Sequence, residues 1–489
     1  MTPNTIGFAL LILGLFLLIG KVMRVKMGWV QRLFLPSSVM GGALILLLGP
    51  QVLGRVAGPW GETGLFTETM VDVWRVLPGL LISVIFATMF LGQELPTAKR
   101  AAKLVGPQLS LGVALGSGQY VVGLLLAGLV LVPLLTASPM TGALIEMGFE
   151  GGHGTAAGMR EVMEDLGFDE GADLAVGLAT VGIVGGIVIG IALINWGVRT
   201  GRTEILKGDV EASVEEQKGL FAQDENYTAG TMTSRPASVE PLSLHMAMVA
   251  VAILIGWVIL EGLRWVEQQT YASVLINGDT PLEIFAYVPL FPLALLGGVA
   301  LQVIAKLVGA DHLIDHQIML RIQGWALDFL IVAAIGTLSL QAIGENLGAF
   351  TLLAVAGVAV NVAIFLWLAP RIIGRYWFER GIGDFGQSMG VTATGLILMR
   401  VTDPDAKSPA FEAFGYKQLI FEPFFGGGLV TALAVPIIFL TGIWPLFFAM
   451  LVVWLIAVGV GLFYFKPRAE QERAEAAAAG KQGADAVTS

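Results

Sequence analysis

The hydrophobic positions of this chain form long runs that do not alternate with polar ones, and short charged or glycine-rich clusters separate the runs. Long continuous apolar runs are typical of membrane-spanning helices, whereas membrane β-strands alternate with a period of two. The pattern predicts an all-α integral membrane protein with five spans in each half and one extra C-terminal span. We expect the spans at about 6–20, 36–54, 77–93, 104–135, 174–198, 244–263, 284–305, 325–343, 349–370, 419–440 and 444–465.

Two of these runs deviate from a plain span. The first carries its basic residues after it, as Lys21, Arg24 and Lys26, so we expect a retained span and not a cleaved signal peptide. The run at 104–135 would extend about 48 Å as one helix, against about 30 Å of hydrocarbon. It therefore predicts either a strong tilt or a break near Pro107, Gly112 and Gly116–Gly118.

The two halves share a motif. Pro36 is followed by four residues and then Gly41-Gly42, and Pro292 is followed by four residues and then Gly297-Gly298. Basic clusters at 99–103 and 371–380 are expected to be cytoplasmic and the acidic segment 62–72 external, which gives the two motif-bearing spans opposite directions. This predicts two inverted-topology five-helix repeats.

The charge pattern also divides the chain. We expect an N-terminal membrane repeat (1–198), a cytoplasmic linker (199–241), a C-terminal membrane repeat (242–441), an extra span (442–466) and a cytoplasmic tail (467–489), disordered or a frayed helix.

Each half also contains a glycine- and threonine-rich interruption, at 150–158 and at 384–395. Non-helical backbone within a bilayer survives where protein or a wet cavity satisfies it, and its freed amides and carbonyls can bind a carboxylate or a cation. Two interruptions in matching places therefore predict a binding site built from two re-entrant or broken glycine-rich hairpins. The alternative is glycines at helix crossings, with threonines bonded back to their own helix.

The candidate ligands lie in these interruptions. Substrate is expected at Gly151, Gly152, His153, Gly154, Thr155, Gln387, Ser388, Met389, Gly390, Thr392, Thr394 and Arg400. Sodium is expected at Glu150, Thr155, Asp384 and Thr392. For three of these residues a structural role is open as well. His153 is either a ligand or a packed neutral histidine, Arg400 either a carboxylate clamp or an interfacial arginine, and Glu150 either an ion ligand, a partner of Arg160 or an interfacial residue.

Composition excludes several classes of function. Apolar residues make up 55% of the chain and charged residues 13%, about half of what soluble domains carry, and there is no cysteine. No phosphate-binding loop or nucleophile elbow occurs, and His312 and His316 lack the glutamate of a hydrolase zinc motif. We therefore expect no enzyme, no organic cofactor, no structural metal site and no nucleic-acid partner.

The residues Gly-Gly-His-Gly-Thr at 151–155 and Gly-Val-Thr-Ala-Thr at 390–394 resemble the paired signatures of the bacterial sodium/glutamate symporter family. Leu166-Gly167-Phe168 before the fifth span and Phe421-Glu-Pro-Phe-Phe-Gly426 fit the same family. The resemblance implies sodium-coupled uptake of glutamate or a related amino-dicarboxylate. It also implies hairpins that meet near mid-membrane, an elevator-like motion, a homodimer in contact with lipid, and the bacterial inner membrane. The alternatives are sodium-coupled transport of another organic anion, and an uncoupled uniporter or channel.

Overall fold

The computed structural model describes residues 3–475, with gaps. The gaps lie at 33–34, 57–62, 94–97, 207–217, 219, 222–227, 271–275, 278–279, 282–284, 286–287 and 404–406. The expected external residue Glu62, residues 207–217, 219 and 222–227 of the expected linker, and residues 476–489 of the expected tail therefore fall outside the described residues.

The first half is helical. Its α-helices are α1 (Pro3–Lys26), α2 (Gly28–Arg32), α3 (Ser37–Leu48), α4 (Leu53–Val56), α5 (Glu68–Thr88), α6 (Ala98–Leu126), α7 (Val132–Leu135), α8 (Leu144–Phe149), α9 (Gly152–Gly158), α10 (Arg160–Asp165) and α11 (Gly171–Arg199). A π-helical turn, η2 (Ala127–Leu131), joins α6 to α7, and a 3-10 turn, η3 (Pro139–Ala143), leads into α8.

The second half adds α13 (Pro241–Gln269), α14 (Leu290–Leu307), η5 (Asp311–Leu313), α15 (His316–Gly336), α16 (Leu340–Glu345), α17 (Leu347–Ile372), α18 (Trp377–Thr402), α19 (Ala410–Phe421), α20 (Leu429–Thr441), α21 (Ile443–Val460) and η6 (Gly461–Phe465). The one described strand pair is β1 (Ile276–Asn277) with β2 (Thr280–Pro281), which are antiparallel. Ten helices among the described residues are long and apolar enough to cross a membrane.

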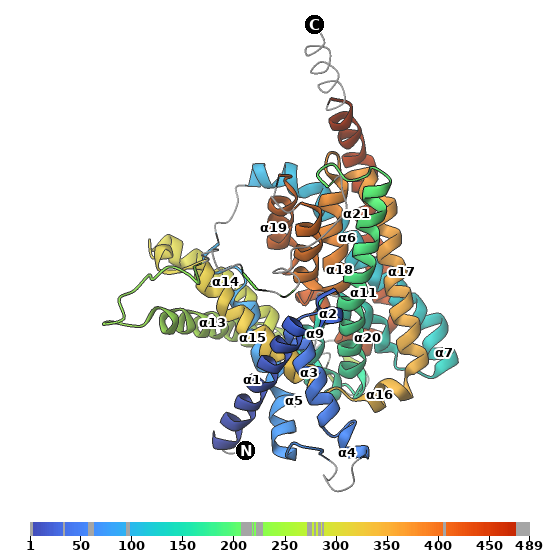
Figure 1. The fold of residues 1–489 in the computed structure, drawn as a ribbon. Coiled ribbons are helices and arrows are strands. Elements are labelled where there is room, and N and C mark those ends of the chain that lie inside the picture. The colour runs from blue at the N-terminus through green and yellow to red at the C-terminus, as the bar shows by residue number, and fades with distance from the viewer. Residues whose placement is uncertain are drawn as a thin grey trace.

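The helices pack in two groups. Helices α1, α3, α5, α13, α14 and α15 form one, the six-helix group, on the left of Figure 1. Helices α6, α11 and α17 to α21 form the other, the broken-helix group, on the right, together with the short helices α8 and α9. The broken-helix group takes its name from interruptions at 150–151, 390–391 and 422–428.

The two Pro-x4-Gly-Gly motifs make equivalent contacts. A Cβ at Gly41 would lie 2.6 Å from the carbonyl oxygen of Phe16 in α1, and one at Gly297 would lie 2.0 Å from that of Ala252 in α13. The second glycine of each motif faces the third membrane-length helix of the other half: Gly42 abuts α15 and Gly298 abuts α5. Glycine is required at all four positions because the helix backbones touch. The motif therefore joins the halves reciprocally.

Three of the expected spans need correction. The span expected at 325–343 is α15 and starts nine residues earlier, at His316. Asp315 caps this N-terminus, since its carboxylate accepts a hydrogen bond from the Ile318 amide. Glu68 and Asp72, expected in a loop, belong to α5. The span expected at 419–440 is not one helix, since α19 and α20 are separated by Glu422–Gly428.

For the long apolar run, where either a strong tilt or a break was expected, the structure shows no break at the named residues. Helix α6 continues through Pro107, Gly112 and Gly116–Gly118, and only a π-helical turn interrupts the path to α7. The glycines instead admit side chains from other helices, since a Cβ at Gly112 would lie 2.5 Å from Cε of Lys417. At the other end of the chain, α21 and η6 continue as helix to Glu475, so the described part of the tail is helical.

Candidate functional site

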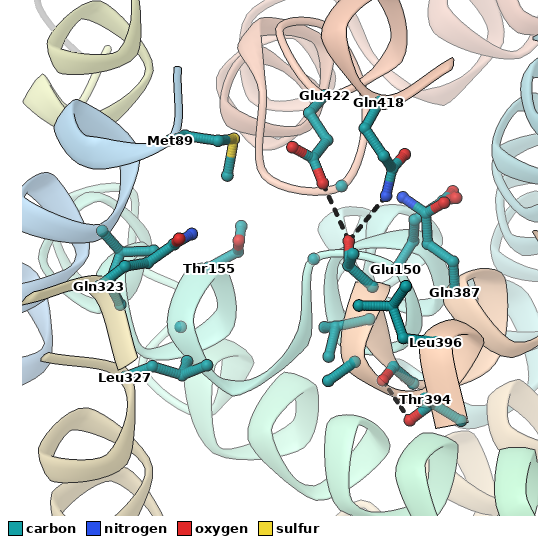
Figure 2. A pocket seen from close by; sticks show the side chains of 18 of the residues that line it. Met89, Glu150, Thr155, Gln323, Leu327, Gln387, Thr394, Leu396, Gln418 and Glu422 are labelled. Atoms are coloured by element: carbon teal, nitrogen blue, oxygen red, sulfur yellow. Dashed lines mark hydrogen bonds between the residues drawn. The ribbon is translucent and has the colours of Figure 1, made fainter. Parts of the chain in front are cut away.

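A cavity of about 680 Å³ lies between the six-helix group and the broken-helix group. Helices α3, α5 and α15 supply one wall, while both glycine-rich interruptions, α11 and α19 supply the other. Figure 2 shows Glu150, Gln387, Gln418 and Glu422 on one side, across from Met89, Gln323 and Leu327 on the other. The cavity therefore sits where segments distant in sequence converge.

The two glycine-rich interruptions touch each other. Gly152 has a φ of +70°, and a Cβ there would lie 2.3 Å from Cγ1 of Val391. Val391 has a φ of +60°, a strained conformation for a β-branched residue. Segments about 240 positions apart by residue number are thus held together by a backbone geometry that only glycine permits at 152.

The first interruption presents buried oxygen atoms. Glu150 is 2% exposed; its Oε1 accepts a 3.3 Å hydrogen bond from Ser388, and its Oε2 has no hydrogen-bond partner among the described residues. The hydroxyl of Thr155, which is 1% exposed, is also without such a partner. Both residues, with Gly151 and Gly154, line the cavity. Unsatisfied buried oxygens are unfavourable unless a ligand or ion completes them.

His153 is held by the neighbouring helix. Its Nε2 lies 2.9 Å from the hydroxyl of Thr180 in α11, and that hydroxyl donates to the carbonyl of Val176. His153 is buried and lines the cavity, so this hydrogen bond orients its ring at the site.

At the bend of the second interruption, other helices satisfy the freed backbone. The carboxylate oxygens of Asp384, earlier in the same segment, have no hydrogen-bond partner among the described residues apart from the ion pair of Oδ1 with Lys417. Helix α18 is non-helical only at Gly390 and Val391. The buried carbonyl of Ser388 accepts hydrogen bonds from Gln119 of α6 at 2.7 Å and from Asn361 of α17 at 3.0 Å. The backbone of α11 packs directly against this bend, since a Cβ at Gly182 would lie 2.1 Å from the carbonyl oxygen of Met389.

The hydroxyls of the second interruption are also engaged (Figure 2). Thr394 donates to the carbonyl of Gly390 at 2.5 Å, which is the back-bonding to its own helix noted above as the alternative to ligand binding. Thr392 donates to Glu422 at 2.9 Å and accepts from Gln418 at 2.8 Å. Both threonines line the cavity, but neither hydroxyl has its proton available for a ligand.

A third interruption, Glu422–Gly428, completes the site. Glu146, fully buried, accepts from Tyr120 at 2.6 Å, from the Gly426 amide at 2.8 Å and from Thr431 at 2.8 Å. These bonds bind the third interruption to α8 just ahead of the first. Gly427 has a φ of +102°, and a Cβ there would lie 2.3 Å from the Thr155 hydroxyl.

Behind the cavity lies a buried ion pair. Lys417 of α19 is 0% exposed, and its Nζ lies 3.2 Å from Oδ1 of Asp384 and 2.5 Å from Oε1 of Gln387. Nζ also lies 4.0 Å from the centre of the Phe421 ring. Asp384 does not line the cavity, whereas Gln387 does.

The other candidates lie elsewhere. Arg400 is exposed near the end of α18 and does not line the cavity. Arg160 pairs with Asp173 at 2.8 Å and Glu164 at 3.7 Å, so it is not the partner of Glu150. Gly152, Ser388 and Met389 lie at the interruptions but do not line the cavity.

The two histidines with helical spacing have separate partners. Nδ1 of His312 contacts the carbonyl of Gly309, and Nδ1 of His316 contacts that of Leu91.

Sequence reasoning missed the third interruption, together with Glu146, Lys417, Gln418 and Glu422. A signal was present: Pro423 and Gly426-Gly427-Gly428 lie inside a span expected to be continuous. Proline and a glycine triplet both argue against an unbroken helix.

Broken helices that meet at an internal cavity, in an all-helical chain with many membrane-length helices, are the organisation of a secondary transporter. The chain belongs to the sodium/glutamate symporter family, because the model of the family described as "Sodium/glutamate symporter" matches residues 4–403. The resemblance inferred from the sequence motifs is thereby confirmed. The protein is a multi-pass membrane transporter and not an enzyme, and sodium is its coupling ion.

Individual relatives are more distant. Proteins named "Sodium/glutamate symporter" from Escherichia coli (strain K12) and Shigella flexneri are each 25% identical to this chain over 297 residues. That similarity covers 59% of this chain and 67% of each relative. Helices α19 to α21, including Lys417 and the third interruption, lie beyond the residues that the family model matches.

Proposed function

We propose that this protein takes up glutamate, or a related amino-dicarboxylate, together with sodium. The observation that carries the proposal is the contact between Gly152 and Val391 beside the cavity. Next to it, Oε2 of Glu150 and the Thr155 hydroxyl have no hydrogen-bond partner in the described part of the chain. A site made by two interrupted segments can bind an anion through amides and a cation through oxygens. The names of the relatives support glutamate as the substrate.

For sodium, the proposal favours Glu150 and Thr155 over Asp384 and Thr392. The first two line the cavity and have oxygens without a hydrogen-bond partner among the described residues. Asp384 does not line the cavity and is paired with Lys417, and the Thr392 hydroxyl donates to Glu422. For substrate, the proposal favours the cavity-lining groups of both interruptions. These are Gly151, His153, Gly154, Thr155, Gln387 and Gly390, whereas the hydroxyls of Thr392 and Thr394, which also line the cavity, donate to protein acceptors.

The charge of the cavity supports coupling to more than one sodium ion. Its lining includes four carboxylates, Glu150, Asp328, Glu412 and Glu422, and no lysine or arginine among the described residues. An anionic substrate enters such a cavity only if cations balance the charge. One elementary charge crossing 100 mV is worth about 2.3 kcal/mol, so one sodium would merely offset the charge of one glutamate.

The proposal also covers the architecture. The reciprocal packing of the two Pro-x4-Gly-Gly motifs supports two inverted repeats. The cavity between two helix groups supports an elevator-like motion, in which the broken-helix group carries the site past the six-helix group. A homodimer in a bacterial inner membrane is expected from the family.

Uptake into proteoliposomes tests the function. Radiolabelled glutamate should accumulate when sodium is high outside, and replacement of sodium by potassium should abolish accumulation. Aspartate and succinate as competitors report whether the ammonium group and the chain length matter. Glutamate uptake that is independent of sodium would support an uncoupled uniporter and contradict the proposal.

A further inference from the structure

The cavity offers a substrate carboxylate few donors. Four carboxylates line it, and no lysine or arginine does so among the described residues. The side-chain amides that line it are those of Gln93, Gln323, Gln387 and Gln418. Gln418 already donates to Thr392, and Gln93 lies against His316. Gln387 and Gln323 are therefore the two lining amides to consider as hydrogen-bond donors to a substrate carboxylate.

Gln387 differs from Gln323 because a buried ammonium lies behind it. Lys417 has no solvent exposure, and its Nζ is 2.5 Å from Oε1 of Gln387. The ammonium is also paired with Asp384 and lies over the Phe421 ring. A Cβ at Gly112 of α6 would lie 3.0 Å from Nζ, so the lysine fits there because residue 112 is glycine.

This contact decides which way the Gln387 amide points. A lysine ammonium can only donate hydrogen bonds, so the amide oxygen must face Lys417. The amide nitrogen then points away from Lys417, and no hydrogen-bond partner of Nε2 occurs among the described residues. An oriented N–H donor is thus left on the wall that Gln387 shares with Glu150 (Figure 2).

The positive charge of Lys417 also influences acidic side chains around the cavity. It acts electrostatically on Glu150 of the first interruption and on Glu422 of the third, besides its partner Asp384 in α18. One buried ammonium thus offsets negative charge contributed by all three interrupted segments. An acidic cavity with this resident cation behind it repels an anionic substrate less than its lining alone would.

We infer that Lys417 is a positioning residue that fixes the Gln387 amide, and that the Gln387 N–H binds a carboxylate group of the transported substrate. The inference rests on the proposed function, because it names the group that would recognise the anionic end of the substrate. Lys417 does not touch the substrate, since it lies behind Gln387 and does not line the cavity.

A pair of charge-matched variants tests the inference on the full-length protein. Gln387→Glu keeps an acceptor for Lys417 but replaces the donor with an anionic oxygen, while Gln323→Glu adds the same charge to the opposite wall. Calorimetric titration of glutamate, aspartate and succinate at saturating sodium measures carboxylate binding. Tryptophan fluorescence during a sodium titration without substrate measures ion binding and the integrity of the fold.

We expect Gln387→Glu to weaken carboxylate binding at least tenfold and Gln323→Glu by less than threefold, with sodium binding within twofold of wild type in both. The double variant Asp384→Asn/Lys417→Met removes the buried pair together. In the wild-type background, the double variant should weaken carboxylate binding at least tenfold. In the Gln387→Ala background it should add less than threefold, because the amide that Lys417 positions is already absent.

Each contrary result has a definite meaning. Equal weakening by the two glutamate substitutions would overturn the inference, because the net charge of the cavity would then explain both. The same holds if the double variant weakens the Gln387→Ala protein as strongly as the wild type. If the wild type binds sodium but none of the three carboxylates, the proposed function and this inference both fail.

Discussion

The first and second interruptions look alike in sequence but differ in how their polar atoms are satisfied. Around Glu150 and Thr155, two buried oxygens have no hydrogen-bond partner among the described residues. Around Gly390 and Val391, protein fills the same need: Gln119 and Asn361 bind the Ser388 carbonyl, and Thr394 bonds back to Gly390. The first interruption therefore offers oxygen ligands suited to a cation, while the bend of the second, at Gly390 and Val391, holds the geometry in which those ligands meet.

This difference is not visible in residue types, since both segments contain glycine and threonine. It depends on helices α6 and α17, whose side chains reach the second interruption but are far from it in sequence. A hydroxyl becomes a candidate ligand when no neighbour uses it. Four substitutions separate the two interruptions on this basis.

The largest effect is expected from Gly152→Ala. The added Cβ would lie 2.3 Å from Cγ1 of Val391, and the alanine would have to adopt the positive φ of residue 152. The free energy of unfolding should therefore fall by about 2–5 kcal/mol. Thermal unfolding and uptake assays should both show the loss. Gly167→Ala is the matched control, because Gly167 has a φ of +73° and no atom within 4 Å of the added Cβ.

Val391→Gly should rescue Gly152→Ala, since it removes the contacting methyl group and relieves the positive φ at 391. If Gly152→Ala is no worse than Gly167→Ala, the two interruptions are not in the close contact described.

Glu150→Gln should have the next largest effect, on ion dependence. Replacing a buried anionic oxygen by an amide removes the charge but keeps the shape, so the sodium concentration for half-maximal uptake should rise at least tenfold. Glu161→Gln on the exposed face of α10 is the control and should leave it unchanged. Unaltered sodium dependence in Glu150→Gln would remove Glu150 from the ion site.

Thr155→Val should weaken sodium activation about tenfold. The substitution removes one uncharged ligand, and a lost buried polar interaction costs about 1–3 kcal/mol, where 1.4 kcal/mol corresponds to tenfold. Sodium titrations of uptake at fixed substrate measure the shift. Thr155→Ser keeps the hydroxyl and should retain most of the wild-type affinity; equal loss in both variants would indicate a packing role.

Thr394→Val should have the smallest effect, less than threefold on sodium and substrate affinity. Its hydroxyl serves its own helix through the Gly390 carbonyl, so removing it changes local helix stability and not the ligand set. The same uptake assay gives the comparison with Thr155→Val. A larger effect for Thr394→Val than for Thr155→Val would reverse the assignment of roles to the two interruptions.

Much of the fold could be read from local sequence. The apolar runs predicted most spans within a few residues, as α11 at Gly171–Arg199 and α17 at Leu347–Ile372 illustrate. The glycine pairs after Pro36 and Pro292 marked real helix contacts. The third interruption escaped because its flanks are as apolar as a continuous span, and hydrophobicity reports what faces lipid and not where the backbone turns.

The sequence by itself determined that this chain spans membranes, where the first two helix interruptions lie, and the family to which it belongs. These properties depend on composition and short motifs, because the bilayer selects long apolar helices and only glycine permits close backbone contacts. The tertiary structure alone decided that Lys417 meets Asp384 and Gln387. It also decided that the Thr155 hydroxyl has no hydrogen-bond partner among the described residues while that of Thr394 has one. Those outcomes depend on contacts between segments far apart in the chain, and local residue patterns do not encode which distant donor reaches which acceptor.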